Sequence, residues 1–136
     1  MREVLLLGAA GLALAGCGFS TESNEASGSG SATELTITVG AQDADSEVMT
    51  LTCDPAGGDH PGRAAACATL LSADPEVFEP VPADQSCTMI YGGPQTATIV
   101  GVLDGTRIDA AFSRQNGCEI ARWDALGPDV FGVPVQ

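Results

Sequence analysis

Four of the five cysteines constrain the fold of this 136-residue chain more than any other feature, because the fifth, Cys17, lies in an N-terminal segment that is not expected to fold. An even number of cysteines in an exported chain predicts disulfides, and four cysteines can pair in three ways. Zinc is the alternative, but the sequence lacks a Cys-x-x-Cys pair and has a single histidine, His60. We therefore expect two disulfides, no metal and no cofactor, and the residues themselves leave the pairing open. The four cysteines of the expected folded part are Cys53, Cys67, Cys87 and Cys118.

The N-terminus has the pattern of an export signal. Arg2 precedes an apolar run, Val4 to Leu14, that is too short to span a bilayer as a permanent helix. Leu12-Ala13-Leu14-Ala15-Gly16-Cys17 resembles the lipobox of bacterial lipoproteins, in which the signal is cut before a cysteine that becomes lipidated. We expect residues 1–16 to be a lipoprotein signal peptide and Cys17 to carry the lipid. An ordinary secretion signal with an incidental cysteine is the alternative, and the protein would then be secreted rather than held at the outer face of the cell membrane.

A flexible tether and one domain follow the signal. Residues 17–33 contain the lipidated cysteine and a segment rich in Ser, Gly, Glu and Asn, with too little apolar content to fold. Such a tether has a root-mean-square reach of about 20–25 Å. Residues 34–136 form one domain near the lower size limit at which an apolar core suffices, so cross-links would help it fold.

The charge balance excludes several partners. The net charge is −13, the sequence contains no lysine, and removal of the signal takes away one charge of each sign. Nucleic-acid binding needs basic phosphate contacts and is therefore not expected. Adsorption to anionic lipid is equally unfavourable, so membrane attachment would depend on the lipid on Cys17.

Alternation of apolar and polar residues predicts a mostly antiparallel sheet. Leu35, Ile37 and Val39 alternate with threonines, and Asp104-Gly105 predicts a type I′ hairpin between two Thr/Val/Ile-rich segments. The predicted strands cover residues 35–39, 47–53, 95–103, 106–113 and 130–133.

Two helices are expected beside the sheet. Residues 62–72 are rich in alanine, with Cys67, Leu70 and Leu71 as an apolar stripe. A shorter helix over 118–126 would turn Ile120 and Trp123 inward. The fold class is therefore α+β, with an antiparallel sheet of about five strands, two short helices packed on one face, and two disulfides.

The segment Cys87-Thr88-Met89-Ile90-Tyr91 is the candidate functional site. It follows a proline-rich approach and precedes Gly92-Gly93-Pro94, without the period of a strand or helix. We therefore expect Met89 to lie in an exposed loop rather than in the core. Such a loop would present an apolar side chain to a partner with a deep apolar pocket.

Several segments, taken in order, resemble the Streptomyces-type subtilisin inhibitor family. The resemblance covers nearly all of residues 35–132, and the four-cysteine spacing combined with the Cys-x-Met-hydrophobic-Tyr loop makes it specific. The segments that carry it are Thr52-Cys53-Asp54-Pro55, Gly58-Asp59-His60-Pro61, Ala65-Ala66-Cys67, Cys87-Thr88-Met89-Ile90-Tyr91, Asn116-Gly117-Cys118-Glu119 and Val130-Phe131.

The resemblance implies a serine protease inhibitor with a substrate-like reactive loop. The scissile bond would be Met89–Ile90, with Met89 entering the S1 pocket of subtilisin-like enzymes, and with chymotrypsin-like enzymes as a second candidate class. Asn116 would brace the loop from beneath. Ser86, Cys87, Thr88 and Tyr91 would complete the loop. Family pairing would join Cys53 to Cys67 and Cys87 to Cys118, and family members form homodimers by packing their sheets together.

Two departures from the family pattern affect the loop. Ser86, three residues before Met89, stands where better-known members carry a larger apolar residue, so an apolar S4 pocket would be underfilled. Gly92-Gly93-Pro94 indicates a longer and looser exit from the loop.

An enzyme is not expected. One histidine, no lysine and no Gly-x-Ser-x-Gly turn leave little from which to build an activated nucleophile. Two alternatives to protease inhibition through the loop stay open: a cell-surface binding or adhesion lipoprotein that reuses the scaffold, and a metalloprotease inhibitor that acts through another surface.

Overall fold

The computed structural model describes residues 32–42 and 44–132. The predicted signal peptide, Cys17 and nearly all of the tether fall outside the described residues, so the signal, the lipid and the tether stay predictions. Within the described ranges, no helix is long and apolar enough to cross a membrane.

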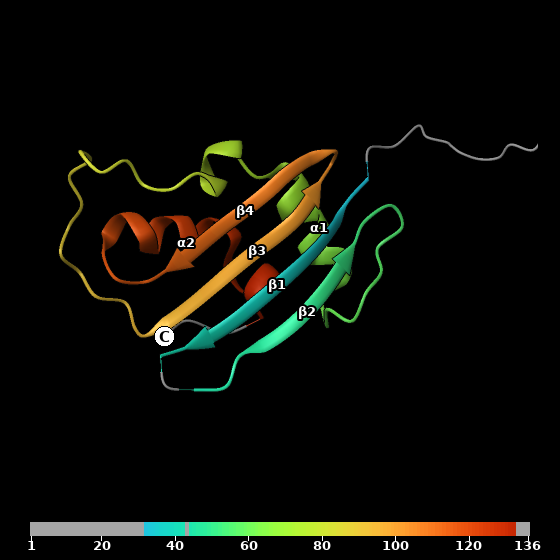
Figure 1. The fold of residues 1–136 in the computed structure, drawn as a ribbon, viewed down its shortest axis with the longest axis horizontal. Helices are drawn as coiled ribbons and strands as arrows, with labels where there is room; N and C mark the ends of the chain where they lie inside the picture. The colour runs from blue at the N-terminus through green and yellow to red at the C-terminus, as the bar shows by residue number, and fades with distance from the viewer. Residues whose placement is uncertain (1–31, 43, 133–136) are drawn as a thin grey trace, which may run out of the picture.

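The described chain builds an antiparallel sheet with the strand order β2-β1-β3-β4 (Figure 1). β1 pairs with β3 along its whole length, with Glu34 opposite Val102 and Ala41 opposite Gln95. Asp104 and Gly105 both have positive φ, of 48° and 82°, as the predicted type I′ turn requires. The strands are β1 (Glu34–Ala41), β2 (Glu47–Thr52), β3 (Gln95–Leu103) and β4 (Thr106–Ser113).

Two α-helices lie on one face of this sheet (Figure 1). α1 (Arg63–Ser72) contacts β2, and α2 (Gly117–Phe131) contacts both α1 and β4. A short 3-10 helix, η2 (Pro75–Phe78), lies against β4, and Asp74 caps it by accepting a hydrogen bond from the Glu76 N–H. The predicted α+β class is confirmed, with four strands in the described part of the sheet.

The core lies between the inward face of the sheet and the helices. Phe131 stacks on Trp123 with 4.4 Å between ring centroids, and Phe112 lies 5.3 Å from Phe131 on the other side. Alternate strand residues complete the core, as the alternation in the sequence predicts. They include Leu35, Ile37, Val39, Met49, Leu51, Ala97, Ile99, Ile108 and Ala110.

The predicted last strand is wrong, because Val130 and Phe131 end helix α2. The helix bends at Gly127, whose φ of 64° suits glycine, and Pro128 then begins a further helical turn. This turn places Phe131 between Trp123 and Phe112, where an extended strand would carry it away from the core.

The inward faces of the helices differ in two places from those predicted. Leu71 is exposed on α1, and Ala66 is buried beside Cys67 and Leu70 instead. Cys67 is bonded to Cys53, so the bridge fixes which side of α1 faces the end of β2. Ile120 is half-buried rather than part of the core.

His60 has a structural role at the entrance to α1. Its ring is buried, with Nε2 2.8 Å from the carbonyl oxygen of Val130, and its Nδ1 accepts a hydrogen bond from the Gly62 N–H at 2.9 Å. Both ring nitrogens are therefore used to join this loop to the end of α2. Nowhere in 32–42 or 44–132 do three or more His, Cys, Asp or Glu side chains gather as they would around a metal ion.

Asp59 makes the loop after β2 sensitive to acid. Its Oδ1 accepts hydrogen bonds from the Thr50 N–H at 2.6 Å and from the Thr50 hydroxyl at 3.1 Å. The backbone hydrogen bond, followed by the hydroxyl, lowers the pKa of Asp59 below its ordinary value of 3.8. Because the folded state has the lower pKa, the stabilisation is complete above the ordinary value and is lost as the pH falls through the folded-state pKa.

Asp59→Asn is therefore expected to flatten the acid dependence of stability. Urea unfolding of both proteins from neutral pH to below 3.8 should show the wild type losing its advantage over the variant as the pH falls. A difference in unfolding free energy that stays constant over this range would contradict the assignment.

Candidate functional site

The segment between η2 and β3 projects beyond the end of the sheet where β3 begins (Figure 1). Residues 85–93 of this segment have no regular secondary structure. Met89 is 91 % exposed, and its neighbours Ile90 and Tyr91 are 61 % and 64 % exposed. The predicted exposed loop is confirmed, and three consecutive large side chains are presented to solvent at its tip.

Two contacts fix the chain just before Met89. Cys87 is bonded to Cys118 in the first turn of α2, and the Gly117 N–H donates a hydrogen bond of 2.9 Å to the carbonyl oxygen of Thr88. A Cβ at Gly117 would overlap Thr88 Oγ1, so glycine permits this close approach. We call Cys87, Cys118, Thr88 and Gly117 the upstream clamp. The sequence pattern around Gly117 indicates only a turn and does not reveal this contact.

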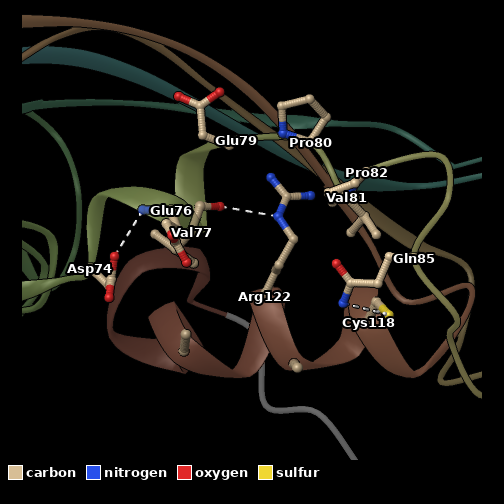
Figure 2. Close-up of a pocket in the computed structure, with 12 residues that line it drawn as sticks. Asp74, Glu76, Val77, Glu79, Pro80, Val81, Pro82, Gln85, Cys118 and Arg122 are labelled. Atoms are coloured by element: carbon tan, nitrogen blue, oxygen red, sulfur yellow. Dashed lines mark hydrogen bonds between the residues drawn. The ribbon is translucent and has the colours of Figure 1, made fainter.

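A cavity of about 570 Å³ lies between α2 and the proline-rich approach to the loop. Figure 2 shows Arg122 projecting from α2 between η2 and this approach, with its Nε donating to the carbonyl oxygen of Val77 at 3.1 Å. At the far end of the approach, Gln85 Nε2 lies 3.6 Å from Cys118 Sγ. Helix η2 and Gln85, which flank the approach, are thus each in contact with α2.

The exit from the loop is held more firmly than the sequence indicates. The Gly92 N–H donates to the carbonyl oxygen of Arg114 at 2.7 Å, and Arg114 Nε donates to the carbonyl oxygen of Gly92 at 3.1 Å. The expectation of a loose exit is therefore wrong at Gly92. Arg114 could not be recognised from the sequence, because Gly92 and Arg114 are 22 positions apart and no local pattern marks the pair.

Asn116 is the N-cap of α2. Its Oδ1 accepts a hydrogen bond of 3.0 Å from the Glu119 N–H, and this is the bond its side chain makes with the described part of the chain. Capping stabilises the first turn of α2, which carries Gly117 and Cys118. A direct bracing role for Asn116 stays a prediction.

Both disulfides that the resemblance implies are present. Cys53–Cys67 joins the end of β2 to α1, and Cys87–Cys118 joins the loop to α2, with Cα–Cα distances of 5.8 and 5.4 Å. The first bridge lies at the end of the sheet near the β3–β4 hairpin, and the second lies at the opposite end. Only the second bridge acts directly on the exposed loop.

These features define a small disulfide-linked α+β domain that presents a braced, solvent-exposed loop. The chain belongs to the subtilisin inhibitor-like family, whose model matches residues 29–116. The matched range includes the loop and Arg114 and ends one residue before α2.

Similar proteins are found in Streptomyces. Subtilisin inhibitor-like protein 1 of Streptomyces cacaoi is 42 % identical over 81 residues, which cover 57 % of this chain and 73 % of that protein. Protease inhibitor SIL-V5 of Streptomyces luteoverticillatus is 35 % identical over 94 residues, covering 63 % and 86 %. Among solved structures, Streptomyces caespitosus sermetstatin in complex with Bacillus licheniformis subtilisin matches with a TM-score of 0.49 and 26 % identity, covering 75 % of this chain and 99 % of that one.

Proposed function

We propose that this protein inhibits subtilisin-like serine proteases by presenting Met89–Ile90 as a substrate that is held in place. The observation that carries the proposal is a 91 %-exposed Met89 in a loop fixed on both sides, in a chain of the subtilisin inhibitor-like family. The protease-inhibitor names of its relatives support the same function.

The braced loop explains how a substrate-like segment can inhibit. A loop that already has an extended shape loses little conformational freedom on binding, so more of the contact energy appears as affinity. Residues before Met89 can pair with an edge strand of the enzyme, as peptides do in β-augmentation. Cys87 and Thr88 are fixed to α2, so this part of the loop is positioned before the enzyme arrives.

Met89 determines the class of target. An unbranched, adaptable apolar side chain suits the open S1 pocket of subtilisin-like enzymes and also that of chymotrypsin-like enzymes. A trypsin-like pocket with a buried carboxylate selects Arg or Lys and should accept this loop poorly. Ile90 and Tyr91 would then lie on the leaving side of the scissile bond.

Ser86→Met is expected to tighten inhibition of subtilisin about tenfold, because an apolar side chain would fill a pocket that serine leaves empty. Ser86 is exposed, so the larger side chain needs no repacking of the fold. Inhibition constants of the two proteins measured side by side decide the matter, and Ser86→Thr serves as the control that adds little apolar surface. Equal constants for wild type and Ser86→Met would refute the reasoning.

The function is tested by titrating subtilisin with the chain from residue 18 onward. Loss of activity at a one-to-one ratio is expected, and mass spectrometry of the complex after acid dissociation should find cleavage only at Met89–Ile90. Absence of inhibition at micromolar concentration would reject the proposal. Trypsin and a metalloprotease, tested in parallel, show whether another target class is preferred.

We also propose that the protein forms a homodimer through the outer face of the sheet. The helices leave this face uncovered (Figure 1). Val48 and Val100 are exposed on it, and their partners on β1 are Thr38 and Thr36. Apolar side chains in that position favour association. Sedimentation equilibrium at micromolar concentration should give the mass of two chains, and the mass of one chain would contradict the dimer.

The lipid on Cys17 is proposed as the membrane attachment. β1 begins beside the β3–β4 hairpin, where the Gly105 N–H donates to the carbonyl oxygen of Ala32 at 2.9 Å. The Met89 loop joins the start of β3, whereas the hairpin follows its end. The nine residues of β3 therefore separate the loop from the hairpin by about 30 Å. A tether attached at the hairpin end therefore leaves the loop accessible. Radiolabelled palmitate should be incorporated into the wild-type protein and not into Cys17→Ser.

A further inference from the structure

After Met89, the backbone of Gly92 is held by Arg114. Its backbone carbonyl accepts from the Gly92 N–H at 2.7 Å, and its side-chain Nε donates to the Gly92 carbonyl at 3.1 Å. Both polar backbone groups of Gly92 are therefore bonded to Arg114. Gly92 lies three residues after Met89, on the side that would leave if the Met89–Ile90 bond were cut.

The Arg114 side chain is itself fixed. It is only 6 % exposed, its NH1 lies 2.9 Å from Asp124 Oδ1, and its guanidinium group lies 5.9 Å from the ring of the fully buried Trp123. Asp124 and Trp123 belong to α2, as do Gly117 and Cys118 of the upstream clamp. The same helix therefore holds the chain on both sides of Met89–Ile90.

Glycine at position 92 is part of this arrangement. A Cβ on Gly92 would lie 2.8 Å from Ile120 Cδ1 and 3.1 Å from Arg114 Nε. The backbone can approach α2 and the guanidinium group this closely because the side chain is absent. We call Gly92, Arg114 and Asp124 the downstream clamp.

The two clamps limit how far the cut ends could move. When a protease serine attacks Met89, its oxygen forms an ester with the Met89 carbonyl and the Ile90 amine is released. Ile90 and Tyr91 alone separate this amine from Gly92, so it can lie no further than about 7 Å from its anchor. An amine confined this closely returns to the ester at a high effective concentration. Its return rebuilds the Met89–Ile90 amide and gives the proton back to the serine hydroxyl.

We propose that Arg114 is a positioning residue that keeps the Ile90 amine beside the acyl group and so favours rejoining of the bond over hydrolysis. The inference rests on the proposed inhibition through Met89–Ile90. Arg114 and Gly92 retain the segment that begins with the Ile90 amine. The Cys87–Cys118 bridge retains the segment that ends with Met89. The role is separate from affinity, because Arg114 is buried behind the loop and does not lie on the surface that Met89 presents.

The test compares cleavage of the inhibitor with its initial inhibition. Wild type, Arg114→Ala, Arg114→Lys and Gly92→Ala, each from residue 18 onward, are incubated with a catalytic amount of subtilisin. The ratio of cleaved to intact chain at equilibrium is then measured by mass spectrometry. Arg114→Ala should raise this ratio by about tenfold, because a hydrogen bond from a charged donor is lost. Arg114→Lys keeps the charge near Asp124 but not the planar Nε donor, so its ratio should also rise.

Matched controls separate positioning from folding. Arg107 is an exposed arginine on β4, and Arg107→Ala should leave the ratio unchanged. If Arg114→Ala does not fold, Gly92→Ala decides, because it disturbs the same contact while the buried arginine stays in place. Wild-type ratios in both Arg114→Lys and Gly92→Ala would overturn the inference while leaving the inhibitor function intact. Failure of the wild type to inhibit would instead reject the proposed function.

Discussion

Replacing Met89 by glycine is expected to weaken inhibition of subtilisin by about two to three orders of magnitude. Met89 is 91 % exposed, so nearly its whole side chain is available for burial in an enzyme pocket, which contributes about 1.5–3 kcal/mol. Glycine also loosens the loop and adds about 1 kcal/mol to the cost of ordering it on binding. The two effects together amount to about 2.5–4 kcal/mol, or about a hundredfold to a thousandfold in the inhibition constant.

The Met89→Gly experiment has a clean control in Met89→Leu. Leucine keeps an apolar side chain of similar volume, so this variant should inhibit almost as well as the wild type. Neither change touches the core, and both proteins should therefore unfold at the same temperature as the wild type. Inhibition by Met89→Gly as strong as that by the wild type would show that subtilisin is recognised elsewhere on the surface.

The sequence predicts well those elements whose conformation depends on neighbouring residues in the chain. Leu35, Ile37 and Val39 alternate with threonines, and the structure buries all three, because a strand turns every second side chain to the same face. Asp104-Gly105 likewise forms the expected turn, since two consecutive positive φ angles are demanding and few residue pairs allow them. The exposure of Met89 was predictable because the residues around it lack the spacing of apolar side chains that a buried helix or strand shows.

The sequence-based predictions are wrong where tertiary packing determines the local structure. Val130 and Phe131 favour a strand by composition, yet they are helical because Phe131 packs between Trp123 and Phe112. One local signal points to this outcome: Pro128 after Gly127 is typical of a new helical turn. Leu71 continues the apolar stripe of α1, but the Cys53–Cys67 bridge turns another side of the helix toward the sheet.

The braces of the loop are the part of the site that the sequence conceals. Contacts between Gly92 and Arg114, and between Thr88 and Gly117, join residues that are distant along the chain. Glycine in both pairs marks a close backbone approach, but Gly92 and Gly117 each also fit an ordinary turn. A local pattern cannot distinguish these two uses, whereas the tertiary structure does.

The two disulfides allow stability and inhibition to be separated. Replacing Cys87 and Cys118 by serine should cost about 4 kcal/mol of unfolding free energy, and replacing Cys53 and Cys67 about 3 kcal/mol, from the loop-closure entropies of separations of 31 and 14 residues. The similar costs make the second variant a matched control for the first. Urea unfolding of both variants measures these costs directly.

The consequences for inhibition should nevertheless differ. Cys87 lies two residues before Met89, so losing its bridge frees the acyl side of the scissile bond, and subtilisin should cut this variant about a hundredfold faster than the wild type. Cys53–Cys67 lies at the other end of the sheet, and its loss should leave the cleavage rate nearly unchanged at temperatures where the domain stays folded. Equal cleavage of the two variants would mean that global stability protects the loop. Selective cleavage of the Cys87→Ser/Cys118→Ser variant would place the resistance in the upstream clamp, where the cut end is held to α2.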